Sequence, residues 1–271
     1  MKQNIQIQIA DPAGNITAFV RDPIPRSRYR RIAQEILSDN NYAAEQVAFL
    51  TGPRSMEMSG LEFCGNATRS FALLRAKEEG ITSPARLLIR TSGWDQPLPV
   101  DVDPERETAR IEMPLPRRIF PAVSTPLPEI EGEPIVDFGG IMHLVTDKIP
   151  PTEKAFETIR RWMSRTFDPP ALGVMFLDPK QKDPDALHLT PAVYVRDVDS
   201  IYWEGSCGSG TTAAAAALIL RSQKEALSVD LIQPAGTIHA GANKENKKIR
   251  RLTIESPVRI SEIIEIEIEV E

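Results

Sequence analysis

Apolar and polar residues alternate in a pattern that predicts the same order of elements twice along the chain. The strands predicted in the first half are 5–9, 16–20, 46–50, 87–90, 100–102 and 110–113. The strands predicted in the second half are 135–138, 142–145, 173–177, 192–195, 228–232, 237–240 and 251–255. Between the second and third strands of each half, apolar residues at helical spacing predict an amphipathic helix, first from Ile32 to Leu37 and then from Phe156 to Met163.

Each half also contains one cysteine at the predicted start of a further helix. Residues 64–68 read Cys-Gly-Asn-Ala-Thr, and residues 207–211 read Cys-Gly-Ser-Gly-Thr. The helix predicted at 211–222 has no polar face, so we expect it to be buried. The helix after Cys64 carries Arg69 and Arg75, so we expect it to be less fully enclosed, or the arginine stems to reach outward.

The repeated order predicts an α+β protein of two pseudo-symmetric lobes, each a sheet wrapped around the helix that follows its cysteine. The predicted lobes are residues 1–125 and 126–271. Their boundary falls in the proline-rich segment 114–134, where missing backbone donors are expected to prevent regular structure. Apolar residues alternate with glutamate over 264–271, which predicts a last strand with one solvated face. This strand could close either lobe, and as residues 263–271 it would complete the first.

Composition and charge narrow the classes of function. Hydrophobic residues make up 41% and charged residues 26% of the chain, values typical of soluble globular proteins. The longest apolar run, 213–220, is far shorter than the ~18 residues of a membrane span, and the first residues have no secretion-signal layout. We therefore expect a cytoplasmic protein without a membrane partner. The net charge of −6, with acidic residues flanking each basic cluster, also disfavours nucleic acid as a partner.

The cysteines and histidines predict no metal site. Cys64 and Cys207 are the only cysteines, so a disulfide framework is excluded, and neither has a partner at Cys-x-x-Cys spacing. His188 and His239 stand apart from any acidic or cysteine cluster.

The two cysteine motifs predict a pair of anion sites. Each cysteine precedes a glycine at a helix N-terminus, where unpaired backbone N–H groups and a partial charge of about +0.5 favour an anion. We expect each thiol pKa to fall from near 8.5 towards ~7 or lower. If the repeat brings the two helix ends face to face, the carboxylate of one small ligand would lie between two sulfur atoms.

Two opposed thiols suit the inversion of an amino-acid α-carbon. One thiolate removes the proton on one face, and the opposite thiol returns a proton on the other. Backbone donors aimed at the carboxylate would stabilise the developing charge. Other interpretations stay open. Each cysteine alone could be a small buried residue, the pair could be a redox couple, and a two-lobed amino-acid binding protein would hold a carboxylate without moving a proton.

Around these motifs the chain resembles the diaminopimelate epimerase-like family of cofactor-independent amino-acid racemases and epimerases. The resemblance is carried by Glu-Phe-Cys-Gly-Asn at 62–66, Ser-Cys-Gly-Ser-Gly at 206–210 and Gly-Asn at 14–15, and it covers the whole chain in layout. It implies two lobes, each a β-barrel around a central helix, an amino-acid substrate, no cofactor and a homodimer. It also implies that Cys64 and Cys207 are the acid/base pair. The residues that it implies for substrate binding are Asn15, Gly65, Asn66, Gly208 and Ser209.

A closer resemblance is to the histidine racemases of opine-metallophore (staphylopine-type) biosynthesis. It is carried by Glu-Gln-Val at 45–47, Met-Ser-Gly at 58–60 and Trp-Glu at 203–204. It implies that Glu45 contacts the substrate side chain, since a carboxylate accepts a hydrogen bond from an imidazole. Glu45 could equally be a solvated carboxylate at a strand start, and Asn15 a turn residue after a glycine.

Two related activities fit less well. Diaminopimelate epimerases usually have Glu-Arg-Gly where this chain has Val-Asp-Ser at 198–200, so the cation for a distal carboxylate is missing. They also tend to have Asn-Val-Gly where this chain has Ala-Leu-Gly at 171–173. Proline racemase-like proteins typically have histidine at the position of Asn66. His143 lies where the family often has a histidine close to the site, so it either helps to set the charge of a thiol or lies in the core.

Overall fold

The computed structural model describes residues 2–178 and 186–269 of the 271-residue chain. The predicted α+β class is confirmed, with four α-helices and seventeen strands in the described part. The chain divides into two compact units, Met1–Glu112 with Glu255–Glu271, and Met113–Ile254. The change of unit thus falls at Glu112, earlier than the predicted lobe boundary after residue 125, and the last strand belongs to the first unit.

The first unit is a mixed sheet with two α-helices. Its strands are β1 (Lys2–Asp11), β2 (Thr17–Val20), β3 (Gln46–Gly52), β4 (Ser55–Met58), β5 (Ala85–Thr91), β6 (Leu98–Asp103), β7 (Thr108–Glu112) and β17 (Arg259–Glu269). β1 is antiparallel to both β2 and β17, β2 is parallel to β3, and β3 is antiparallel to β4. β4 continues parallel to β5, and β5, β6 and β7 form an antiparallel meander. Residues 270–271 of the predicted last strand lie outside the described residues.

The two helices of the first unit are buried to different degrees. α2 (Gly65–Glu78) packs against β1, β5, β6 and β7, and nearly all of its side chains are buried. Arg69 is fully buried, so the expectation of a less enclosed helix or an outward stem is wrong for this residue. α1 (Tyr29–Ser38) buries only one face, on β3 and β17. Leu37, predicted on that face, is 40% exposed.

The second unit has the same order of elements. Its strands are β8 (Arg118–Pro121), β9 (Pro134–Asp137), β10 (Ile141–Thr146), β11 (Ala171–Leu177), β12 (Ala186–Val195), β13 (Ser200–Trp203), β14 (Ala226–Gln233), β15 (Gly236–Glu245) and β16 (Lys248–Pro257), whose last residues pass into the first unit. β9 is antiparallel to β10, β10 is parallel to β11, and β11, β12 and β13 are antiparallel. β12 is also parallel to β14, which pairs with β15.

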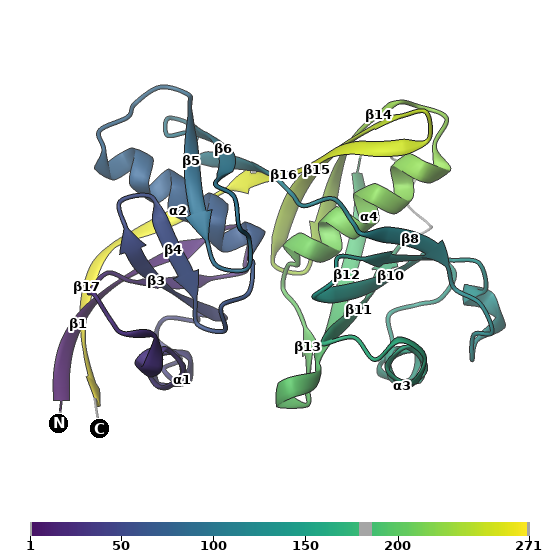
Figure 1. Ribbon diagram of the computed structural model, residues 1–271, viewed down its shortest axis with the longest axis horizontal. Coiled ribbons are helices and arrows are strands. Elements are labelled where there is room, and N and C mark those ends of the chain that lie inside the picture. The colour runs from purple at the N-terminus through teal and green to yellow at the C-terminus, as the bar shows by residue number, and fades with distance from the viewer. Residues whose placement is uncertain (1, 179–185, 270–271) are drawn as a thin grey trace. The chain divides into compact units, whose positions relative to one another are not determined.

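The helices of the second unit repeat the arrangement of the first. α4 (Gly208–Arg221) packs against β9, β10, β11, β14 and β15, and its alanines are buried as predicted. α3 (Glu153–Phe167) packs on β11 and buries Phe156, Ile159 and Met163. Figure 1 shows α2 and α4 each among the strands of their own unit, whereas α1 and α3 lie outside those strands. Each cysteine helix is therefore the central helix of its unit.

The proline-rich segment is more regular than predicted. β8 pairs antiparallel with β9, and Ile119 and Phe120 lie opposite Val136 and Ile135. A short 3-10 helix spans Pro128–Ile130, and two more span Arg26–Arg28 and Arg196–Val198. The expectation of no regular structure is wrong because the prolines stand at strand and helix ends, where a missing N–H costs little.

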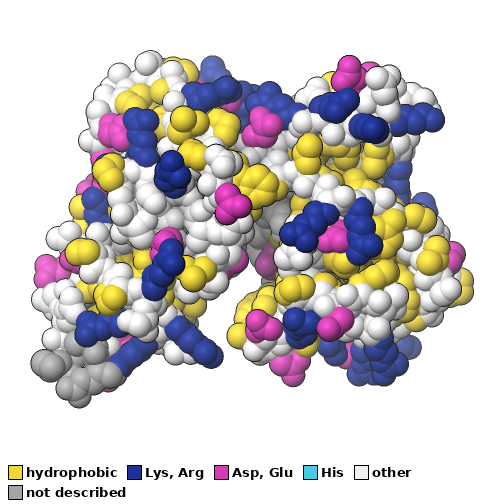
Figure 2. All heavy atoms as spheres, in the orientation of Figure 1, with side chains coloured by type: hydrophobic (Ala, Val, Ile, Leu, Met, Phe, Trp, Pro, Cys, Tyr) yellow, Lys and Arg dark blue, Asp and Glu magenta, His cyan; other side chains and the backbone are white. Residues whose placement is uncertain are grey.

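The surface carries charges of both signs. On the face drawn in Figure 2, lysine and arginine side chains are interspersed with acidic and apolar ones. Among the described residues, no helix is both long enough and apolar enough to cross a membrane.

Candidate active site

Cys64 is the N-cap residue of α2. Its extended backbone (φ −129°, ψ 112°) turns the side chain back over the first turn of the helix. There the sulfur accepts a hydrogen bond from the N–H of Ala67 at 3.4 Å. The carbonyl of Cys64 accepts from the N–H and the hydroxyl of Thr68, at 2.9 and 2.7 Å. The thiol is therefore held at a helix N-terminus, in the position where side chains usually cap unpaired N–H groups.

Cys207 caps α4 in the same way. Its backbone angles are φ −128° and ψ 112°, and its sulfur accepts from the N–H of Gly210 at 3.3 Å. The N–H of Cys207 donates to Gln233 at 2.8 Å, and the amide of Gln233 donates to Thr211 at 2.9 Å. The two motifs that look alike in sequence therefore have the same local geometry, one in each unit.

Gly210 is closely packed between Met175 and Cys207. A Cβ atom at this position would collide with the sulfur of Met175 and would lie 3.1 Å from the sulfur of Cys207. A side chain at this position would therefore displace the thioether of Met175, which lies on β11. In α2 the corresponding residue is Ala67, which is accommodated and fully buried.

A polar network in the first unit joins three of the predicted residues. Oδ1 of Asn15 accepts from Nδ2 of Asn66 at 3.0 Å and from Nε2 of Gln46 at 2.8 Å. Nδ2 of Asn15 donates to the carboxylate of Glu45 at 3.0 Å. Gln46 also hydrogen-bonds the thiol of Cys64. Asn15 is thus more than a turn residue, because its amide orientation is fixed by donors on one side and a carboxylate on the other.

Glu45 stays accessible at the edge of this network. It directly precedes β3 and its side chain is exposed. Desolvation by its neighbours raises the pKa of its carboxyl, the hydrogen bond from Asn15 opposes this shift, and the charge of Asp11 adds to it. Glu45 can therefore accept a hydrogen bond from a small polar molecule without losing its bond to Asn15.

In the second unit, Ser209 links Cys207 to a buried histidine. Oγ of Ser209 lies 3.5 Å from the sulfur of Cys207 and 2.9 Å from Nε2 of His143. His143 is completely buried, and this burial lowers its pKa to about 3, so its ring is neutral near pH 7. A Cβ atom on Gly173 of the neighbouring strand would collide with this ring. His143 is both a core residue and part of a chain of contacts that ends at the thiol.

The expected fall of both thiol pKa values is wrong. Burial raises the pKa of Cys64, the charge of Glu62 adds to this, and the N–H of Ala67 and the amide of Gln46 lower it. Burial raises the pKa of Cys207 further above its usual value. The charge and the hydrogen bond of Glu204 add to that rise, while Ser209 and Gly210 oppose it. The helix N–H groups act in the predicted direction, but loss of water around the sulfur outweighs them.

The remaining predicted residues occupy the first turns of the two helices. Gly65 and Asn66 are the first residues of α2, and Gly208 and Ser209 are the first of α4. N–H groups at these positions have no partner within their helix. Each cysteine therefore lies beside the two predicted backbone donors of its own unit.

Three residues without a predicted role contact the thiol motifs. Gln46 and Glu204 affect the thiol pKa values, and Gln233 fixes the backbone of Cys207. Gln46 starts a mostly apolar strand and is half-buried, and Gln233 is a buried polar residue at the end of an alternating strand. A glutamine at the end of such a strand was the signal for both. Glu204 belongs to the Trp-Glu pair at 203–204 that carries the family resemblance.

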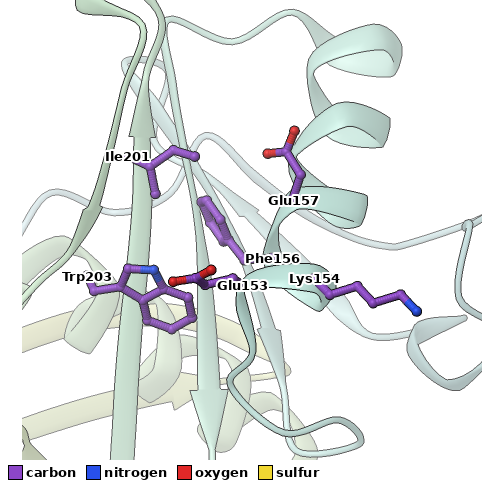
Figure 3. Close-up of a pocket in the computed structure, with 6 residues that line it drawn as sticks. All are labelled: Glu153, Lys154, Phe156, Glu157, Ile201 and Trp203. Carbon is purple, nitrogen blue, oxygen red and sulfur yellow. The ribbon is translucent and has the colours of Figure 1, made fainter.

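A pocket elsewhere in the second unit contains none of the predicted residues. It is an open groove of about 630 Å³, lined by Glu153, Lys154, Phe156, Glu157, Ile201 and Trp203. In Figure 3 the carboxylate of Glu153 points towards the indole of Trp203, across the start of α3 from β13. Trp203 packs against Phe156 and Phe176, with ring centroids 5.9 and 6.2 Å apart. Its lining contains no cysteine and no histidine.

No cluster of three or more histidine, cysteine, aspartate or glutamate side chains suited to a metal ion occurs within residues 2–178 and 186–269.

Comparison with known sequences identifies the family. Residues 4–263 match the model of the histidine racemase CntK N-terminal domain. A histidine racemase of Fusobacterium nucleatum subsp. nucleatum is 32% identical over 246 residues, which cover 85% of this chain and 89% of that protein. A histidine racemase of Staphylococcus aureus (strain Mu50) is 26% identical over 225 residues, which cover 78% of this chain and 79% of that protein.

Solved structures show the same fold at low sequence identity. A hydroxyproline epimerase from Agrobacterium vitis with bound trans-4-hydroxy-L-proline superposes with a TM-score of 0.67 at 13% identity. The match covers 97% of this chain and 91% of the epimerase. The family match over most of the chain agrees with the resemblance carried by the two cysteine motifs. The chain belongs to the histidine racemase family.

Proposed function

We propose that this protein is a cofactor-independent histidine racemase in which Cys64 and Cys207 are the acid/base pair. The observation that carries the proposal is the repeated geometry of the two thiols. Each sulfur caps the central helix of its unit, with backbone angles that agree within a degree. The names of the relatives support histidine as the substrate.

The reaction needs one thiolate and one thiol at a time. The thiolate takes the α-proton, so an S–H bond forms and the electron pair of the C–H bond moves into the carboxylate. The other thiol then delivers its proton to the opposite face of the α-carbon and becomes the thiolate. No electron is transferred to another molecule, and the two thiols exchange protonation states in each turnover.

The first turns of the two helices would hold the substrate carboxylate. The N–H groups of Gly65, Asn66, Gly208 and Ser209 stand at positions that lack an intrahelical acceptor. Charge on the carboxylate grows when the α-proton leaves, so these donors would bind the transition state more tightly than the substrate.

Glu45 and Asn15 would select the side chain. The carboxylate of Glu45 is accessible and is oriented by Asn15. It would accept a hydrogen bond from an imidazole N–H. Because the carboxylate is charged, this bond would be stronger than one between two neutral groups. An aliphatic side chain offers no such donor, so Glu45 would favour histidine over leucine or alanine.

We also propose that the D-histidine supplies opine-type metallophore synthesis and that the enzyme acts in the cytoplasm as a homodimer. These proposals rest on the resemblance to the metallophore-linked racemases. Sedimentation of the purified protein tests the dimer, and a single monomer-sized species at micromolar concentration would contradict it.

The proposed reaction is tested by incubating the purified protein with L-histidine in deuterated water without pyridoxal phosphate. We expect D-histidine carrying deuterium at the α-carbon. Diaminopimelate, proline and hydroxyproline in the same assay test the related activities. Absence of exchange with every amino acid would contradict a racemase.

Serine variants separate an enzyme from a binding protein. Cys64→Ser and Cys207→Ser should each reduce exchange roughly 10²–10⁴-fold while histidine still binds. Ser83→Ala changes an exposed hydroxyl and serves as the control. Full exchange in either cysteine variant would contradict the acid/base pair.

A further inference from the structure

Arg69 is a completely buried cation in the second turn of α2. Its guanidinium makes hydrogen bonds only to neutral acceptors. Nε and Nη2 donate to Oδ1 of Asn66, Nη1 donates to the hydroxyl and carbonyl of Ser256, and Nη2 also donates to the carbonyl of Pro12. Within the described ranges of the chain, none of the ion pairs joins Arg69 to a carboxylate.

Such a cation is costly unless an anion compensates it. Burial of an unpaired charge is unfavourable, even when hydrogen bonds satisfy its donors. Two anions act on Arg69 through their charge, the Cys64 thiolate and Glu255. Burial lowers the pKa of Arg69 to about 10, so its guanidinium remains charged near pH 7. The hydrogen-bond acceptors of Arg69 are all neutral. A Cys64 thiolate would therefore give the guanidinium a negatively charged partner.

Asn66 connects Arg69 to the thiol motif. Its Oδ1 accepts both Nε and Nη2 of Arg69, at 3.3 and 3.0 Å. Its backbone N–H hydrogen-bonds the sulfur of Cys64. The guanidinium therefore fixes the orientation of the residue whose backbone contacts the sulfur, and it adds a full positive charge behind the helix N-terminus.

In the described part of the second unit, the helix α4 carries no arginine at the position that corresponds to Arg69. Thr212 stands at the position of Arg69 relative to the cysteine, and its hydroxyl donates to the carbonyl of Gly208 at 2.8 Å. Five alanines follow it. The charged group that acts on Cys207 is instead Glu204, which disfavours the thiolate. A carboxylate therefore acts on each thiol, Glu62 on Cys64 and Glu204 on Cys207, but a buried arginine lies behind the helix start only at Cys64 among the described residues.

We infer that Arg69 is a positioning residue that favours the thiolate form of Cys64 against the effect of burial, so that Cys64 ionises more readily than Cys207. For one enantiomer, Cys64 is then the base and Cys207 is the acid, and the two roles are exchanged for the other enantiomer. The assignment of base and acid rests on the proposed racemase function. The effect of Arg69 on the ionisation of Cys64 does not.

Two carboxylates, Glu62 and Glu255, also affect the pH at which Cys64 ionises. Glu62, in the segment before α2, disfavours the Cys64 thiolate. Glu255, in β16, is half-buried and attracts the guanidinium. Removal of the Glu255 charge should therefore leave more of the field of Arg69 acting on Cys64.

The test is the pH dependence of Cys64 alkylation by iodoacetamide in the full-length protein without substrate, read from the modified peptide. In Arg69→Gln we expect alkylation at neutral pH to slow about tenfold, because an opposite charge nearby stabilises the thiolate. Arg69→Lys should restore most of the rate. Ultraviolet absorbance of the thiolate in a Cys207→Ser background gives the same titration without dependence on reagent access.

Two further variants keep the test decisive. Arg75→Gln removes a cation from the same helix that is paired with Glu78, and it should leave the Cys64 profile unchanged. Glu255→Gln should speed alkylation of Cys64, and it decides the question if Arg69→Gln fails to fold. An unchanged profile in folded Arg69→Gln, or in Glu255→Gln, would overturn the inference. The racemase proposal would stand in that case, because its own test measures exchange.

Discussion

The helices α2 and α4 begin in the same way and differ within two turns. Both start at a capping cysteine followed by glycine, with the same backbone angles. α2 then buries Arg69, whereas α4 continues with threonine and five alanines. The repeated part is the geometry that holds a sulfur and offers N–H donors. The part that differs is the charge buried behind the start of each helix.

The largest expected effect comes from breaking either half of the pair. Cys64→Ser and Cys207→Ser should each lower kcat for both directions of racemisation by roughly 10²–10⁴-fold. Each direction needs both a base and an acid, so the two variants should fail in both directions. Chiral chromatography from either enantiomer measures this. A variant that kept one direction at full rate would contradict the shared role.

His143 lies in the second unit, near Cys207. It should make the free energy of unfolding depend on pH. Its pKa is about 3 in the folded protein, and that of an unfolded histidine is near 6.5, so the unfolded chain binds the extra proton. Its contribution is fully present above pH ~6.5. It falls by about 1.4 kcal/mol per unit between pH ~6.5 and ~3.

Urea unfolding at several pH values measures this slope. His143→Gln should flatten it, and His188→Gln, in the outer part of β12, is the matched control because its side chain is exposed. Equal slopes in the wild-type protein and in His143→Gln would contradict the assignment of a buried neutral ring.

The residue three positions after each cysteine is Ala67 in α2 and Gly210 in α4, and exchanging the two residue types tests the packing difference between the helices. Gly210→Ala should destabilise the protein by ~1–3 kcal/mol and disturb the thiol, because the added methyl group collides with Met175 beside Cys207. Ala67→Gly, the reciprocal change in α2, should cost only ~1 kcal/mol and leave the thiol in place. Denaturant unfolding together with kcat checks both. Equal effects of the two changes would remove the difference.

The smallest effect is expected at Glu45, which has no counterpart assigned in the second unit. Glu45→Gln keeps the acceptor oxygen and removes the charge, so binding of histidine should weaken by about 1 kcal/mol, or roughly fivefold in KM. The kcat should change less, since Glu45 does not touch the α-carbon in the proposed mechanism. Glu57 lies on β4 and pairs with Arg26, so Glu57→Gln provides a control for the loss of a negative charge. A change in kcat without a change in KM would assign Glu45 a different role.

Local pattern predicted the elements well because alternation and helical spacing are properties of short segments. Every predicted strand is present, and both cysteine helices begin at the glycine after the cysteine. The short strands β4, β8 and β13 were not predicted. Each spans four residues, and β8 lies among prolines, so periodicity had too few positions to register.

Electrostatics could not be predicted in the same way. The helix N-terminus correctly indicated donors for each sulfur, but the thiol pKa depends on water excluded by residues distant in sequence. Arg69 likewise looked like a surface residue until its partners at Pro12 and Ser256 were known. The role of the thiols in proton transfer stays a prediction, because local geometry alone does not establish a reaction.

The most direct test of that role is the isotope content of both enantiomers early in the reaction in deuterated water. Starting from L-histidine at a few per cent conversion, two thiols on opposite faces predict deuterium in the D-histidine formed and protium in the L-histidine recovered. The proton taken by the first thiol does not return to the face it left, and the second thiol carries solvent deuterium. Deuterium appearing equally in both enantiomers would indicate a single exchanging base and contradict the two-thiol account.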